Sequence, residues 1–109
     1  MTRNDKILKS IVEAVSKTAP DSEIYLYGSR ARGDFKEYSD WDLLILLNKD
    51  KIPFALETEI IDDLFDVELE TGEVITPLIY PKKEWQEKLS ITPLYENIRK
   101  QGIRIKSAF

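Results

Sequence analysis

The segment from Trp41 to Leu47, Trp-Asp-Leu-Leu-Ile-Leu-Leu, constrains the fold more than any other part of the chain. A membrane span needs roughly 20 apolar residues, so this segment is too short for one. With one polar residue in the run, it is also too apolar for a strand at the edge of a sheet. It therefore predicts a strand inside a sheet that helices cover on both faces.

The flanking segments alternate between helical and strand patterns. Apolar residues at helical spacing predict a first helix that Asn4 or Asp5 caps and that ends near Ala19. The later elements, in chain order, are a strand over Glu23–Tyr27, a short helix over Ser29–Gly33, a helix after Pro53, a strand over Val74–Tyr80, a short helix over Pro81–Leu89, a helix from Thr92 to Gly102 and an edge-pairing tail over Ile103–Ile105. Pro77 inside the strand over Val74–Tyr80 removes a ladder donor and indicates a sheet edge. This order predicts an α/β (α+β) fold, a small mixed β-sheet flanked by helices, in a single domain over residues 1–109.

Composition excludes several kinds of chemistry. The chain has no cysteine and no histidine, which removes thiolate nucleophiles, imidazole bases and nitrogen- or sulfur-bound metals. Any metal ion must therefore be held by oxygen atoms, which favours Mg²⁺, Mn²⁺ or Ca²⁺. A net charge of −4 argues against generic binding of duplex nucleic acid. No signal peptide or membrane span is visible, so we expect a cytoplasmic protein.

Two carboxylates stand at the start of the central strand. Asp40 and Asp42 are two residues apart, and side chains at that spacing point to the same face of a strand. Carboxylates held this close repel each other unless a cation lies between them. The pair therefore predicts a site for a hard divalent cation, with Trp41 and Leu43 facing the core on the other side.

A glycine turn precedes the carboxylates. Gly28 has no Cβ, so the backbone there can approach a ligand closely, and Ser29 opens a short helix whose first amides suit an anion. Arg30 and Arg32 add positive charge suited to phosphate oxygens, although each could instead pair with a nearby acid such as Asp34 or Glu37. Metal ligands and a phosphate cradle together predict a site for a metal-bound nucleoside triphosphate.

The string Gly28-Ser29-Arg30-x-Arg32-Gly33, followed by Ser39-Asp40-x-Asp42-Leu43 between two apolar strands, resembles the minimal nucleotidyltransferase domain of the DNA polymerase β-like superfamily. The resemblance is specific over Ile24–Leu47. It implies that Asp40 and Asp42 bind two Mg²⁺ ions, or Mn²⁺, and that Gly28, Ser29, Arg30 and Arg32 hold the triphosphate. The implied reaction is attack of an acceptor hydroxyl on the α-phosphate, with release of pyrophosphate.

The same resemblance implies a third carboxylate on a later strand, and the strand expected to carry it, Val74–Tyr80, has none. The segment Asp66–Glu70 alternates like a strand but also continues the helix after Pro53. If it is a strand, Glu68 is the first choice, because Val67 and Leu69 would face inward around it. Asp66, Glu70 and Glu73 are the other candidates, and a solvated acidic face explains the run equally well.

Two functions follow from the resemblance. The first is a Mg²⁺-dependent enzyme that moves a nucleoside monophosphate, AMP from ATP in the first instance, to a hydroxyl group of a protein or other acceptor. The alternative is a catalytically weak or inactive antitoxin of the same fold that binds an all-helical HEPN-type protein, since the chain has no room for a separate acceptor-binding domain. A nucleotide- or metal-binding regulator without transfer is a third interpretation.

Overall fold

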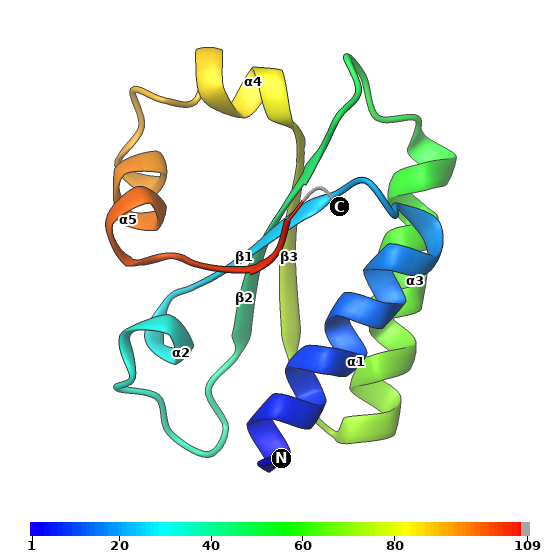
Figure 1. Ribbon diagram of the computed structural model, residues 1–109, viewed down its shortest axis with the longest axis vertical. Helices are drawn as coiled ribbons and strands as arrows, with labels where there is room; N and C mark the ends of the chain where they lie inside the picture. The colour runs from blue at the N-terminus through cyan, green and yellow to red at the C-terminus, as the bar shows by residue number, and fades with distance from the viewer. Residues whose placement is uncertain (108–109) are drawn as a thin grey trace.

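The computed structural model describes residues 1–107 and contains one four-stranded sheet (Figure 1). Its strands are β1 (Glu23–Tyr27), β2 (Trp41–Leu47), β3 (Ile75–Pro81) and β4 (Ile103–Lys106), in the spatial order β3-β2-β1-β4. The strand β2 runs parallel to β3 and antiparallel to β1, and β4 is antiparallel to β1. The small mixed sheet predicted from the sequence is confirmed, with Trp41–Leu47 inside it.

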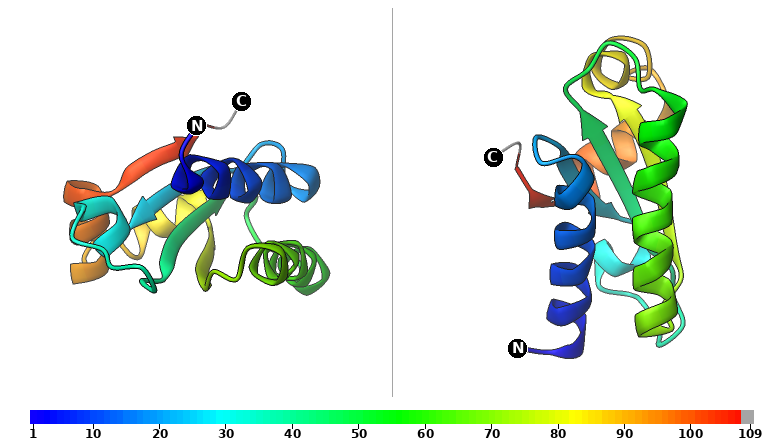
Figure 2. Two further views of the ribbon diagram at one scale, coloured as in Figure 1. Left: turned by 90° about the horizontal axis from the view of Figure 1, so that it is seen from below. Right: turned by 90° about the vertical axis from the view of Figure 1, so that its right-hand side faces the viewer.

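Helices cover both faces of this sheet (Figures 1 and 2). The five helices are α1 (Arg3–Thr18), α2 (Ser29–Arg32), α3 (Phe54–Thr71), α4 (Lys82–Glu87) and α5 (Pro93–Gln101). The long helices α1 and α3 lie side by side on one face, whereas α4 and α5 lie on the other. In the described part of the chain, no helix has the length and apolar character that crossing a membrane requires.

The alternation of side chains along β2 divides the core into two clusters. Leu43, Ile45 and Leu47 point to the face covered by α1 and α3, and Leu44 and Leu46 point to the face covered by α4 and α5. All five are buried. This double burial explains why β2 is apolar at every position except Asp42, where the strand starts.

The first helix is capped differently from the prediction. Thr2 is the N-cap, its hydroxyl accepts a hydrogen bond from the Asp5 backbone N–H at 3.1 Å, and the Asp5 carboxylate accepts one from the Thr2 backbone N–H. The prediction that Asn4 or Asp5 caps α1 was therefore wrong by two or three residues, because the reciprocal Thr2–Asp5 pair satisfies two backbone donors at once.

The segment Asp66–Glu70, for which the sequence allowed either a strand or a helix, is helical. It forms the C-terminal part of α3, which runs on to Thr71 and ends where Gly72 adopts a left-handed conformation with φ of +75°. Val67 is buried but Leu69 is exposed, so the pattern around Glu68 is that of a helix with one face on the core. The alternative of a strand over Asp66–Glu70 is therefore wrong.

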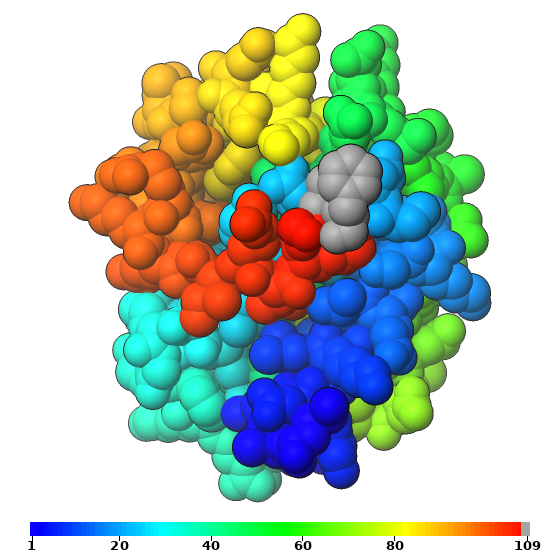
Figure 3. Space-filling model, viewed as in Figure 1, coloured from blue at the N-terminus to red at the C-terminus, as the bar shows by residue number. Residues whose placement is uncertain are grey.

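The two edge strands differ in character. The strand β3 lies at one edge, as Pro77 predicted, and β4 lies at the other, where it confirms the edge-pairing tail. Figure 3 shows the residues of β4 lying across the molecule between α5 and α1. Lys106 fixes the end of β4, because its ammonium group donates to the carbonyl oxygens of Pro20 and Ser22.

Candidate functional site

Asp42 lies at the start of β2 on the α4/α5 face of the sheet, and Asp40 lies directly before the strand. Asp40 is exposed just before the strand, and Asp42 is half-buried and opposite Tyr27 of β1. Asp42 shares its face with Leu44 and Leu46 because these residues are separated by two and four positions. Burial raises the pKa of Asp42, and the nearby charge of Asp40 raises it further, whereas Arg32 lowers it. The pair is thus electrostatically coupled, as a cation site requires.

The turn after β1 brings the backbone against Asp42. Gly28 has φ of +74° and ψ of −159°, a conformation that is essentially restricted to glycine. A Cβ atom at this position would overlap Oδ2 of Asp42. The missing side chain therefore leaves room for the carboxylate of Asp42. The close approach of a ligand to Gly28 stays a prediction.

The short helix α2 starts directly after this turn. The Gly28 carbonyl oxygen accepts hydrogen bonds from the N–H groups of Ala31 and Arg32, both at 3.1 Å. Ser29 is the first residue of α2 and is half-buried beside the turn. The first amides of a helix have no acceptor within that helix. Gly28 and Ser29 thus lie together at the end of β1, next to Asp42.

The two arginines have different surroundings. Arg30 has a side chain only 4% exposed, lies over the rings of Phe35 and Trp41, and donates to the Ser39 carbonyl oxygen at 3.0 and 3.2 Å. Its guanidinium group also lies 3.7 Å from the Glu73 carboxylate. Arg30 thus anchors the loop before β2 through its Nε and Nη2 groups, and its predicted contact with phosphate stays a prediction.

Arg32 is the arginine available to a ligand. Its guanidinium group is exposed, contacts Asp34 at 3.4 Å and Gln101 at 3.5 Å, and is close enough to lower the pKa of Asp42. These contacts are exposed to solvent and weak, so an anion at the Gly28 turn could replace them at little cost.

The acids considered as the third carboxylate do not lie beside Asp42. Glu68 belongs to α3, which packs on the opposite face of the sheet, and Asp66 and Glu70 are on the same helix. Glu73 is paired with Arg3 at 3.3 Å and with Arg30. The choice of Glu68 is therefore corrected: the sheet separates it from the Asp40–Asp42 pair. Among residues 1–107, no group of three acids or other metal-ligating side chains is assembled.

Thr76 lies beside Asp42, and the sequence analysis did not predict this neighbour. Its Cα pairs with that of Asp42 in the parallel β2–β3 ladder, so both side chains point to the same face, about 5 Å apart across the strands. Thr76 is exposed. The sequence indicated only that Thr76 lies in a strand. Its neighbour Asp42 could not be identified until the register between β2 and β3 was known.

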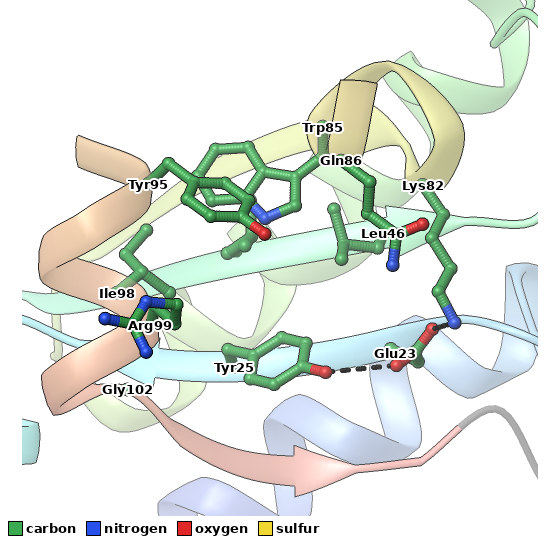
Figure 4. Close-up of a pocket in the computed structure, with 11 residues that line it drawn as sticks. Glu23, Tyr25, Leu46, Lys82, Trp85, Gln86, Tyr95, Ile98, Arg99 and Gly102 are labelled. Atoms are coloured by element: carbon green, nitrogen blue, oxygen red, sulfur yellow. Dashed lines mark hydrogen bonds and ion pairs between the residues drawn. The ribbon is translucent and has the colours of Figure 1, made fainter. Parts of the chain in front are cut away.

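A pocket of about 330 Å³ lies on the same face, between the sheet and the helices α4 and α5 (Figure 4). Its walls include the rings of Trp85 and Tyr95, whose centroids are 5.3 Å apart, and the side chains of Leu44 and Leu46. The pocket is lined by residues of β1, β2, α4 and α5, so no local sequence pattern pointed to it.

One rim of this pocket is a polar cluster around the buried Glu23 carboxylate. The Glu23 carboxylate accepts the Tyr25 hydroxyl at 3.0 Å and pairs with the Lys82 ammonium group at 2.6 Å (Figure 4). Burial raises the pKa of Glu23, but the bonds from Lys82 and Tyr25 outweigh it and hold the pKa below its usual value. With its charges already paired, the pocket suits an uncharged planar group better than an anion.

Comparisons with known proteins agree with the geometry. The family model described as "Nucleotidyltransferase domain" matches residues 8–104 of the chain. A search of curated proteins found no match.

Three solved structures share the fold. One is the crystal structure of a toxin-antitoxin with AMP-PNP, with a TM-score of 0.66 and 18% identity over 92% of this chain and 73% of that one. The others are two mutants of the toxin-antitoxin MntA-HpeT. The first has a TM-score of 0.64 and 15% identity over 92% of this chain and 72% of that one. The second has a TM-score of 0.60 and 18% identity over 98% and 74%.

Proposed function

This chain belongs to the nucleotidyltransferase domain family, and from that premise we propose that it transfers AMP from ATP, with Mg²⁺, to a hydroxyl group of a protein or other acceptor. The observation that carries the proposal is the contact between two parts of the sequence motif. Gly28 has no side chain where the Asp42 carboxylate lies against the turn, and the charge of Asp40 is close enough to raise the pKa of Asp42. Carboxylates beside a glycine turn suit a metal-bound triphosphate.

The donor set fits a divalent cation. Asp40 and Asp42 supply hard oxygen ligands. Burial and the charge of Asp40 raise the pKa of Asp42, and a bound cation would oppose both effects. Such an ion, when bound, neutralises the triphosphate and polarises the α-phosphate toward attack. Asp40 and Asp42 would hold and orient it, and Thr76 supplies at most a neutral hydroxyl at the neighbouring position.

The remaining residues of the site would bind and orient the nucleotide. Gly28 and Ser29 would receive the terminal phosphates, because their backbone can be approached closely. Arg32 would exchange its exposed contact with Asp34 for a phosphate oxygen. We place the base in the pocket beneath α4 and α5, since Leu44 follows Asp42 by two residues, or about 7 Å, on the same face.

The test is a titration of Mg²⁺-ATP followed by backbone NMR shifts and by fluorescence of Trp85, together with a transfer assay using α-labelled ATP. We expect Mg²⁺-dependent shifts at Gly28 and Asp42, and their loss in the double variant Asp40→Asn plus Asp42→Asn. Asp50→Asn is the matched control, because Asp50 is exposed just beyond the other end of β2. Binding of Mg²⁺-ATP by the double variant with unchanged affinity would refute the site.

A second candidate function is an antitoxin that binds a helical HEPN-type protein and has weak or no transferase activity. Two observations favour it: Thr76 stands beside Asp42 where a third carboxylate is missing, and the similar structures are toxin-antitoxin proteins. The discriminating experiment is co-expression with the protein encoded next to this chain. A stable complex without pyrophosphate release favours the antitoxin, and labelling of that partner from α-labelled ATP favours the enzyme.

A further inference from the structure

The helix α3 carries apolar residues on two faces, and only one of them is covered. Ile60, Leu64 and Val67 are buried against the sheet. Phe54, Ile61, Phe65 and Leu69 recur at spacings of seven, four and four residues, which places them together on another face of the helix. Their exposed fractions are 83%, 43%, 54% and 69% in that order. We call these four residues the α3 stripe.

The described chain leaves Phe54 and Leu69 of the α3 stripe largely exposed and covers Ile61 and Phe65 only in part. In the right-hand view of Figure 2, α3 runs in front of the sheet over its whole length, with no other element before it. Exposing two phenylalanines and two aliphatic side chains on one helix face is unfavourable, and contiguous apolar patches of this kind mark interaction sites.

The charges bordering the stripe are all of one sign. The segment Phe54–Thr71 contains seven of the 20 acids of the chain and no lysine or arginine. By helical spacing, Glu57 and Glu68 border one side of the stripe, and Asp62 and Asp66 border the other. The rest of the chain holds all 16 lysines and arginines against 13 acids, so the acidic charge is concentrated on this helix.

Of these acids, Glu57 lies in the first turn, where the helix dipole favours it, but the acids farther along α3 do not stabilise the helix. Acids in the C-terminal half of α3 oppose the helix dipole, and its last turn has no basic residue. Like charges at spacings of four, such as Asp62 and Asp66, also destabilise an isolated helix by a few tenths of a kcal/mol. A binding partner of opposite charge would explain why α3 carries these acids beside an exposed apolar stripe.

We propose that the α3 stripe docks a helix of a partner protein whose apolar face is bordered by lysines and arginines. Such a helix would bury its apolar side chains on the stripe and pair its cations with Glu57, Glu68, Asp62 and Asp66. A second copy of this chain fits poorly, because two α3 helices would bring acid against acid. The surface also lies on the face of the sheet opposite to Asp42, so the partner leaves the nucleotide site open.

This inference rests on the proposed protein partner and is independent of nucleotide transfer. The probe is a pair of 18-residue helical peptides with the same leucine stripe, one bordered by lysine and the other by glutamate. Each is titrated into the full ¹⁵N-labelled chain at 50 and 500 mM NaCl. We expect the lysine peptide to bind at least about tenfold more tightly at low salt, with shifts centred on Ile61, Phe65 and Leu69, and the advantage to shrink at high salt.

Variants separate docking from general attraction between opposite charges. Phe65→Ser plus Leu69→Ser keeps every charge and should lose binding, while Ile91→Ser, an exposed apolar residue 90% accessible between α4 and α5, should not. Asp62→Lys plus Glu68→Lys should reverse the preference to the glutamate peptide. Thermal unfolding confirms that each variant folds.

Three results would overturn the proposal. They are equal binding of the two peptides, retention of binding by the serine double variant, and a dimer of the chain that this same variant dissociates. Titration of Mg²⁺-ATP into the same samples keeps the two proposals apart. Asp40→Asn plus Asp42→Asn should bind the lysine peptide like the unmodified chain, whether or not the nucleotide site functions.

Discussion

Substitution of Gly28 by alanine tests the contact on which the nucleotide site depends. The backbone at Gly28, with φ of +74° and ψ of −159°, lies in a region that side chains avoid at a cost of about 1–3 kcal/mol. The new methyl group would also overlap the Asp42 carboxylate, which must rotate away. We therefore expect two effects from Gly28→Ala, a loss of stability and a displaced metal ligand.

Gly33→Ala separates these two effects. Gly33 also has a positive φ, +85°, but a Cβ atom there meets nothing within 4 Å. The control should lose only about 1–2 kcal/mol for the left-handed conformation. Each kcal/mol lowers the Tm by about 4 °C in a chain of this size. Gly28→Ala should lose at least as much stability, with the displacement of Asp42 in addition.

The assays are urea unfolding followed by tryptophan fluorescence, since Trp41 is buried, and Mg²⁺-ATP binding by NMR. We expect Gly33→Ala to bind Mg²⁺-ATP like the unmodified chain, and Gly28→Ala to weaken binding at least about tenfold, equivalent to 1.4 kcal/mol. Unchanged binding in Gly28→Ala, with a stability loss no greater than that of Gly33→Ala, would refute the argument that the bare turn makes room for Asp42.

Three further predictions concern single side chains around the site. Because burial and Asp40 raise the pKa of Asp42, the folded chain holds that proton more tightly than the unfolded chain, and stability falls as the pH rises from the usual value near 3.8 through the raised pKa. Asp42→Asn should therefore raise the Tm of the metal-free chain at pH 7 by about 1–3 °C, and a lower Tm would contradict this. Arg30→Ala should lower the free energy of unfolding, measured in urea, by about 3 kcal/mol, because it leaves Glu73 and the Ser39 carbonyl oxygen without this partner. Arg30→Lys should recover only part of this loss. A loss below about 1 kcal/mol in Arg30→Ala would show that these contacts do not stabilise the loop. Thr76→Asp should place a third carboxylate beside Asp42 and raise Mn²⁺ affinity about tenfold, measured by electron paramagnetic resonance, whereas Glu68→Asp on the other face should leave it unchanged.

The elements that carry the motif were predictable because their signals are local. The run Trp41–Leu47 is apolar on both faces wherever it lies, so it had to be covered, and β2 is indeed buried on both sides. The spacing of Asp40 and Asp42 also predicted that the two carboxylates lie close together, and the charge of Asp40 does act on Asp42 at the start of β2. Thr92 and Pro93 likewise predicted the start of α5 correctly, since an N-cap hydroxyl acts only on its own first turn.

The sequence analysis fell short where a residue's role depends on distant partners. Arg30 and Arg32 look alike in the sequence, and only the fold of the loop over residues 33–40 turns Arg30 inward onto Ser39 and leaves Arg32 beside Asp42. Glu68 shares its segment with a strand-like alternation, which helical packing of Val67 against the core overrides. Neither outcome has a local signal.

The sequence by itself determined the covered strand, the pair of acidic residues at its start and the glycine turn before it. Each of these follows from the chemistry of one residue or from the two-residue period of a strand. The tertiary structure alone decided which face of the sheet each acid lies on, that Thr76 stands beside Asp42, and that the α3 stripe remains exposed. Those properties depend on strand register and on the packing side of a helix, which are set by burial summed over the whole chain.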